Sequence, residues 1–208
     1  MALHRSVRHA VFFGLYPDSR ASDRASRLAR TSGLTPAGRM HVTLVGLPHG
    51  DAPPAEAWLA KVVSAGGRVR HPPFLIELTI LGSFGRPGGD EQAVVLRGED
   101  GVIGIHQLCE AILRQLKAEG LRGRPSGTPH LTVAHSRRFL PDQPVDPVRW
   151  TARELLLIHS FQGEGRHEIL ARWPLAGADA SHPPSGSPGA SPPASGRAPD
   201  ARLPGGHR

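Results

Sequence analysis

Two four-residue stretches with the same pattern constrain this chain more than any other feature. They are His41-Val42-Thr43-Leu44 and His130-Leu131-Thr132-Val133, and each reads histidine, apolar, threonine, apolar. Each lies in a run that predicts a buried β-strand, residues 40–45 and 129–134. Because successive side chains of a strand point to opposite faces, the histidine and the threonine share one face and the apolar residues share the other.

Two such strands facing one another would place two imidazoles and two hydroxyls around one small space, which suits acid–base chemistry on a phosphate. A third match, His4-Arg5-Ser6-Val7, has no apolar strand around it, and with 12 histidines about one accidental match is expected. The other two stretches lie 89 positions apart (130 − 41), which leaves room for half a domain between them. The alternative is a pair of core histidines held by ordinary hydrogen bonds.

Around these stretches the hydrophobic pattern predicts alternating strands and helices. We expect a helix capped by Asp18 and running to about Ser32, and further helices at 55–65 and 102–119, with Cys109 on an apolar stripe as a core residue. Loops are expected at 121–128 and 141–147. The other expected strands are 7–15, 74–81, 92–96, 154–160 and 167–173, and in 74–81 the alternation predicts a buried face of Phe74, Ile76, Leu78 and Ile80.

This order predicts an α+β fold with two pseudo-symmetric lobes, in which antiparallel sheets and flanking helices surround a central cleft that carries both motifs. We expect residues 1–176 to form this domain. Residues 177–208 are almost entirely Gly, Pro, Ala and Ser with scattered charge. Such a segment cannot bury enough apolar surface to offset its ordering entropy, so we expect a disordered tail.

Composition narrows the classes of partner. The formal charge is +7, and 23 of the 25 basic residues are arginine, since the only lysines are Lys61 and Lys117. Guanidinium forks match phosphate oxygens, so the composition favours a phosphate-bearing partner, of which nucleic acid is the commonest; the alternative is a compositional bias toward arginine. The single cysteine, Cys109, excludes an intramolecular disulfide and a cysteine metal cluster, which fits a reducing cytoplasm. No stretch has the apolar length of a membrane span, so no membrane partner is expected.

The paired motifs, about 90 residues apart, resemble those of the 2H phosphoesterase superfamily. The branch that the chain is most similar to is that of the bacterial and archaeal RNA 2′,3′-cyclic phosphodiesterases, also called 2′-5′ RNA ligases. Further agreement lies in Phe12-Phe13-Gly14-Leu15, in Gly46-Leu47 after the first motif and in the closing hairpin, so the resemblance covers roughly residues 8–174.

The resemblance implies a metal-free and cofactor-free attack on a cyclic phosphodiester. His41 would be the proton donor, His130 the proton acceptor, and Thr43 and Thr132 would bind the phosphate oxygens. The substrate would be an RNA with a cyclic phosphate end or a small cyclic nucleotide, and we expect a monomer. Members often carry an arginine after each motif, where this chain has Val45 and His135. Candidate RNA contacts in their place are Arg137 and Arg138.

Three alternatives stay open beside hydrolysis. One is 2′-5′ ligation or another cyclic-nucleotide reaction of the same superfamily, run without ATP because the chain has no Gly-rich nucleotide loop. Another is an RNA-end binding protein without catalysis. The third is a metallohydrolase, although the sequence contains neither His-x-His nor His-Glu-x-x-His spacing.

Overall fold

The computed structural model describes residues 8–48, 50–88 and 91–177 of the 208, so the expected tail lies outside the described residues from 178 onward. Within these residues the chain forms nine strands and three α-helices. The helices are α1 (Ser19–Thr31), α2 (Glu56–Gly67) and α3 (Ile103–Ala118), the last preceded by a 3-10 turn, η1 (Asp100–Val102). The strands are β1 (Arg8–Leu15), β2 (Val42–Gly46), β3 (Phe74–Phe84), β4 (Gln92–Arg97), β5 (Arg124–Pro125), β6 (His130–Ser136), β7 (Gln143–Ala152), β8 (Glu154–Gln162) and β9 (Arg166–Pro174).

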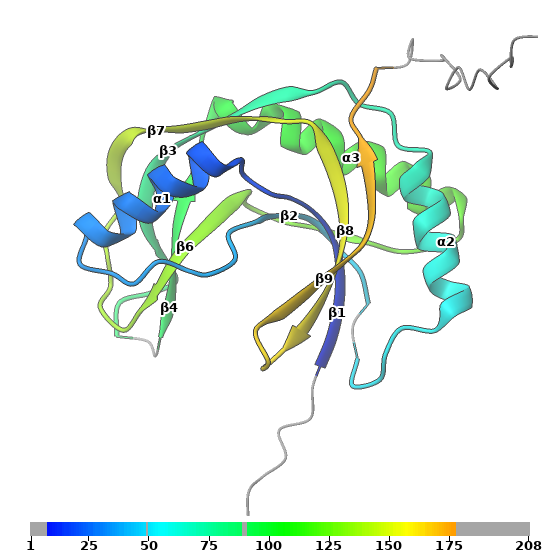
Figure 1. Cartoon of the computed structure of the whole chain (residues 1–208), viewed down its shortest axis with the longest axis horizontal. Coiled ribbons are helices and arrows are strands. Elements are labelled where there is room, and N and C mark those ends of the chain that lie inside the picture. The colour runs from blue at the N-terminus through cyan, green and yellow to red at the C-terminus, as the bar shows by residue number, and fades with distance from the viewer. Residues whose placement is uncertain (1–7, 49, 89–90, 178–208) are drawn as a thin grey trace, which may run out of the picture.

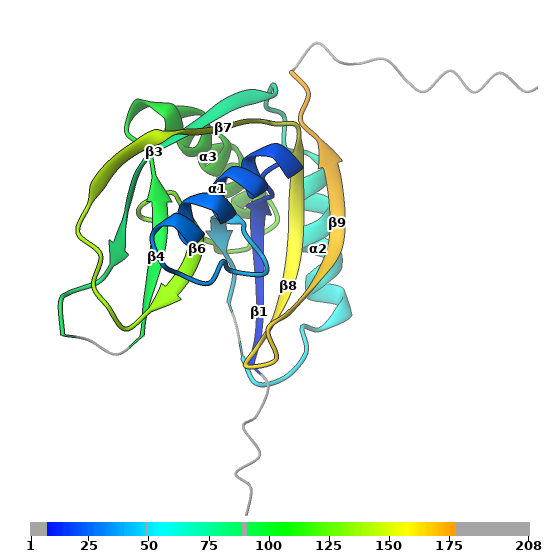
Figure 2. The ribbon, with the colours of Figure 1, turned by 60° about the vertical axis from the view of Figure 1, so that its left-hand side comes forward.

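All nine strands of the described residues belong to one antiparallel sheet. Its order is β7-β3-β4-β6-β2-β1-β8-β9, and β5 pairs with β2 outside this path. The sheet has two halves of four strands each, and they meet where β6 pairs with β2, the two strands that carry the motifs. Figure 1 shows this sheet bent into an arch, and Figure 2 shows the halves side by side. The expected α+β class is therefore confirmed, and the expected lobes are halves of a single sheet.

The helices cover this sheet through small and apolar stripes. Asp18 caps α1 as expected, since its carboxylate accepts a hydrogen bond from the Ala21 amide at 2.8 Å. The buried alanines of α1 face β6 and β7, whereas α2 packs on β8 and β9 and α3 packs on β2 and β3. In Figure 1, α2 and α3 lie along the outer side of the arch. None of the helices in the described residues is long and apolar enough to cross a membrane.

Two strands lie where the sequence predicts loops. Strand β7 contains Pro144 and Pro147, and a proline cannot donate a backbone hydrogen bond to a neighbouring strand. The strand is nevertheless possible because β7 is at the edge of the sheet and pairs on one side only, with β3. The two-residue β5 lies inside the predicted loop 121–128 and pairs with Val45 and Gly46. It is too short for any hydrophobic period to reveal.

The predicted buried face of β3 is correct for only half of its length. Ile76 and Leu78 are wholly buried, but Ile80 is half-buried and its neighbour Leu81 takes its place in the core. The pairing of β3 with β7 shifts between Leu78 and Ile80, and such an irregularity moves the following side chains to the other face. Strict alternation therefore predicts the wrong residues beyond Leu78.

Two adjacent glycines of α2 differ in their contact with β9 and supply a matched test of this packing. A Cβ on Gly66 would overlap the Trp173 ring, with Cζ2 only 2.7 Å away, whereas a Cβ on Gly67 would lie at an ordinary 3.5 Å from Trp173 Nε1. We predict that Gly66→Ala destabilises the protein by about 1–3 kcal/mol despite its better helix propensity. Thermal unfolding should show a lower midpoint for Gly66→Ala and no loss for Gly67→Ala. Equal midpoints would contradict the packing of α2 on Trp173.

Candidate active site

The pairing of β2 with β6 decides which side chains of the two motifs meet. Val42 pairs with Leu131 in antiparallel register, and both side chains are wholly buried. Around that pair the register sets His41 opposite Thr132 and Thr43 opposite His130. Directly opposed side chains have Cβ atoms about 4.5–5.5 Å apart and diagonal ones about 7–8 Å. The motifs therefore form a square with the two histidines on one diagonal and the two threonines on the other.

A β-bulge follows the threonine in each motif strand. In β2, Phe13 pairs with Val45 and Gly14 with Thr43, so Leu44 is the extra residue. In β6 the register slips in the same way, with Val94 opposite Ala134 and Val95 opposite Thr132, so that Val133 is extra. Both extra residues are wholly buried. The bulge explains why an apolar residue ends each motif and why the next residue, Val45 or Ala134, is also in the core.

The segment before each histidine crosses to the opposite motif strand and bonds to its bulge. The Ser126 amide donates to the Leu44 carbonyl at 2.8 Å, and the Ala37 amide donates to the Val133 carbonyl at 2.7 Å. Both donors stand four residues before their histidine. The thiol of Cys109 also donates to the Leu44 carbonyl at 3.4 Å, and burial raises its pKa to about 11, so Cys109 is a core residue as expected.

Both imidazoles are anchored in the same manner. His41 Nδ1 lies 3.2 Å from the carbonyl oxygen of Arg39, and His130 Nδ1 lies 2.8 Å from that of Thr128, in each case two residues earlier. A carbonyl oxygen only accepts, so Nδ1 carries the hydrogen in the neutral ring and Nε2 keeps its lone pair. Each Nε2 is thereby presented to take or give a proton.

An aromatic ring from another strand supports each of these imidazoles. Phe12 of β1 packs on His41 with ring centroids 5.1 Å apart, and Phe84 of β3 packs on His130 at 4.8 Å. His167 of β9 approaches the edge of His41 at 5.1 Å, and its own Nδ1 is buried without a partner in the described residues. The two sides of the site differ here, since among the described residues only the His41 side has a third histidine against it.

Burial decides the charge state of the His41 and His167 imidazoles. It lowers the pKa of the His41 imidazole below its ordinary value; the hydrogen bond to the Arg39 carbonyl opposes this, and the charges of His130 and Arg39 lower it further. Burial, and then the charges of His41 and Arg39, lower the pKa of His167 to about 4. Both rings are therefore neutral in the free protein at neutral pH.

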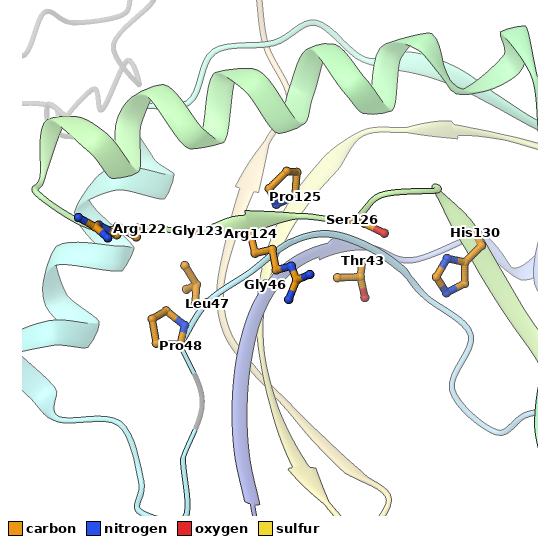
Figure 3. Close-up of a pocket in the computed structure, with 10 residues that line it drawn as sticks. All are labelled: Thr43, Gly46, Leu47, Pro48, Arg122, Gly123, Arg124, Pro125, Ser126 and His130. Carbon is orange, nitrogen blue, oxygen red and sulfur yellow. The ribbon is translucent and has the colours of Figure 1, made fainter. Parts of the chain in front are cut away.

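Each of two clefts combines the histidine of one motif with the threonine of the other. The larger, about 580 Å³, contains Thr43 and His130, and the smaller, about 380 Å³, contains His41 and Thr132. Figure 3 shows the larger cleft, where Thr43 and His130 point away from α3. Its other lining residues are Gly46, Leu47, Pro48, Arg122, Gly123, Arg124, Pro125 and Ser126, and those of the smaller cleft are Ala37, Gly38, Arg39, His135 and His167.

The structure thus brings together the four motif residues singled out in the sequence. It does not bring Arg137 and Arg138 to them, because both follow the far end of β6, and the Arg138 guanidinium donates to the Ser32 carbonyl at 2.9 Å. Of the two places where the resemblance led us to expect arginine, Val45 is wholly buried and His135 lines the smaller cleft.

Sequence reasoning missed Arg39, Arg124 and His167 as lining residues. The first two had a detectable signal, because the motifs are parts of a longer repeat, Pro-x-Gly-x-x-His-x-Thr, at residues 36–43 and 125–132. Extending the comparison backward from each histidine finds the crossing segments and the arginines beside them. His167 had no such signal, since only the folding of β9 onto β8 and β1 brings it to His41.

The side chains of the site are donors and acceptors of protons more than ligands of metals. In the part of the chain that the structure describes, no three His, Cys, Asp or Glu side chains are grouped so that they could hold a metal ion. The clefts are lined by imidazole, hydroxyl and guanidinium groups, which can exchange protons and donate hydrogen bonds to phosphate oxygens.

Comparison with known proteins agrees with this geometry. Residues 17–162 match the family model of the 2′-5′ RNA ligase superfamily. The chain belongs to the 2′-5′ RNA ligase superfamily. Members of this superfamily are 2H phosphoesterases, so the general class of this chain's chemistry is phosphodiester processing. A search of curated proteins found no match to the chain.

Solved structures share the fold at low identity. A phosphoesterase superposes with a TM-score of 0.65 at 21% identity, over 81% of this chain and 99% of that one. Apo LigT of E. coli gives 0.64 at 20%, over 81% and 98%, and TT0787 of Thermus thermophilus gives 0.60 at 17%, over 81% and 99%. LigT of E. coli also matches in its complexes with phosphate and with 3′-AMP.

The anchoring of the two imidazoles predicts their tautomer. We expect both His41 and His130 to carry the hydrogen on Nδ1 in the neutral form, because a carbonyl oxygen accepts there. Long-range ¹H–¹⁵N NMR spectra at pH 8 distinguish the two ring nitrogens, and exposed His106 on α3 serves as the unanchored control. A hydrogen on Nε2 of either motif histidine would show that the ring is held differently.

Proposed function

We propose that the protein hydrolyses RNA 2′,3′-cyclic phosphodiester ends to 2′-phosphomonoesters with His41 and His130 as an acid–base pair. The observation that carries this proposal is the square of two imidazoles and two hydroxyls around the Val42–Leu131 pair, with each Nδ1 bound to a backbone carbonyl. Each Nε2 is left for the reaction. A phosphate at the centre of the square would have a histidine on each of two opposite sides, as an in-line displacement needs.

In the proposed reaction His130 Nε2 takes a proton from a water molecule as its oxygen attacks phosphorus. The bond from phosphorus to the ribose 3′ oxygen breaks, and protonated His41 gives its Nε2 proton to that oxygen. The product is a 2′-phosphate with a free 3′ hydroxyl. The hydroxyls of Thr43 and Thr132 donate hydrogen bonds to the non-bridging oxygens, where negative charge builds up in the transition state.

The lowered pKa of His41 bears on its role as proton donor. In the free protein at neutral pH the ring is mostly neutral, mainly because it is buried. A bound phosphodiester carries a negative charge next to the ring and favours its protonated form. Substrate binding thus prepares the acid, and a donor with a low intrinsic pKa releases its proton readily to the leaving oxygen. The structures of E. coli LigT with phosphate and with 3′-AMP are in line with an anionic phosphate as the ligand of this fold.

A second candidate is 2′-5′ ligation, which the family's description favours. There the 5′ hydroxyl of another RNA would replace water as the nucleophile, and the same two histidines would move the protons. Supplying a 5′-hydroxyl RNA beside the cyclic-phosphate RNA separates the two, because ligation lengthens the RNA and hydrolysis does not. Neither reaction consumes ATP.

Substitution of either motif histidine tests the proposal. We predict that His41→Ala and His130→Ala each lower turnover of a cyclic-phosphate RNA by about 10²–10⁴-fold, because each removes one proton transfer. The double variant should be little worse than either single one, since the two residues act as a unit. Thr43→Ala and Thr132→Ala should cost less, because each leaves both proton transfers in place.

The matched control is His106→Ala, which removes an exposed histidine of α3 that lines neither cleft and should leave turnover unchanged. Circular dichroism and thermal midpoints establish that each variant is folded. Near wild-type turnover in either motif variant would refute the two-histidine mechanism for this protein.

A further inference from the structure

The two clefts are related by the repeat but differ in what surrounds them. Gly46 lies five residues after His41, and its counterpart His135 lies five residues after His130. In the smaller cleft, His135 and His167 stand beside His41 and Thr132. In the larger cleft the counterpart is a glycine without a side chain, and the space continues past Thr43 toward Arg124 and Arg122. A longer ligand therefore has room to leave the reacting centre on the Thr43 side.

The backbone places Arg122 and Arg124 on the same face of the segment that contains β5. Arg124 pairs with Gly46 in β5, which ties the segment to the end of the motif strand β2. Gly123 between them faces the core, where an added Cβ would lie 2.5 Å from Val45 Cγ1 and 2.9 Å from Leu116 Cδ1. In an extended segment, alternate residues share a face, so Arg122 and Arg124 both face away from that core. Figure 3 shows His130, Thr43, Arg124 and Arg122 following one another along the cleft.

Both guanidiniums are available for a ligand. Arg122 and Arg124 are exposed, and among the described residues neither forms an ion pair or a side-chain hydrogen bond. By contrast, Arg97, which lines a separate cleft together with Phe84, forms an ion pair with Asp142. In the part of the chain that the structure describes, no carboxylate lines the larger cleft, and Leu47, Pro48 and Pro125 supply apolar walls next to the arginines. Alternating positive charge and apolar surface suits a chain that carries phosphates and flat rings.

We propose that Thr43, Arg124 and Arg122 form a track for the RNA chain that leads away from the cyclic end, so that the preferred substrate is an oligoribonucleotide and not a cyclic mononucleotide. This inference rests on the proposed hydrolysis at His41 and His130. The guanidiniums of Arg124 and Arg122 bind the phosphates upstream of the terminal nucleotide, and the Leu47–Pro48 wall contacts a base. The track is particular to the second half of the repeat, because the position that corresponds to Arg124 in the first half is Thr35.

Two substrates with the same reacting group test the track. One is uridine 2′,3′-cyclic monophosphate, which has no other phosphate, and the other is a short oligoribonucleotide that ends in the same cyclic uridylate. The measured quantity is the ratio of kcat/KM for the oligonucleotide to kcat/KM for the mononucleotide. We expect the wild-type protein to favour the oligonucleotide, and Arg124→Ala and Arg122→Ala to lower the ratio by about tenfold each, mostly through KM of the oligonucleotide.

The control is Arg114→Ala, which removes the same charge from a position of α3 outside the cleft and should leave the ratio unchanged. Turnover of neither substrate would refute the proposed hydrolysis itself. Equal turnover of both by the wild-type protein, or an equal loss with both in the Arg124 variant, would leave hydrolysis standing and overturn the track.

Discussion

The pairing of Val42 with Leu131 is the constraint on which the site depends. It joins the two halves of the sheet, and its register alone decides that each histidine faces the threonine of the other motif. A slip of either strand by one residue would turn that strand's histidine toward the core and its buried side chains toward the cleft. The burial of Val42, Leu44, Leu131 and Val133 opposes such a slip, so the apolar residues of each motif hold the polar ones in place.

The segments that cross from one motif strand to the other reinforce the pairing of β2 with β6. Each bulge carbonyl accepts a hydrogen bond from the segment that precedes the other histidine, so backbone hydrogen bonds couple the positions of the two motifs. The same segments supply the carbonyls of Arg39 and Thr128 that orient the imidazoles. Backbone position and ring orientation thus come from one set of contacts, which keeps both Nε2 atoms at a defined separation and suits a reaction in which two proton transfers must be coordinated.

The chemistry of the site was easier to predict from sequence than its surroundings. His41, Thr43, His130 and Thr132 follow from a period-two pattern in apolar runs, because that pattern states which residues share a face. Strand β7 did not follow, since its prolines are tolerated only at a sheet edge, and edge position is a property of the whole fold. Ile80 and Leu81 exchanged places for the same kind of reason, because an irregular pairing with a distant strand breaks the alternation. His167 reaches His41 through tertiary structure alone.

The two motif histidines are proposed to exchange protons with a cyclic phosphodiester as a pair, and every other proposal about the site depends on this. The most direct test is the pH dependence of kcat/KM for a cyclic-phosphate RNA, measured in the presence of a metal chelator. One imidazole must be protonated and the other neutral, so we predict a bell-shaped profile whose two limbs belong to the pair. A rate that rises steadily with pH, or that disappears with the chelator, would contradict the paired mechanism.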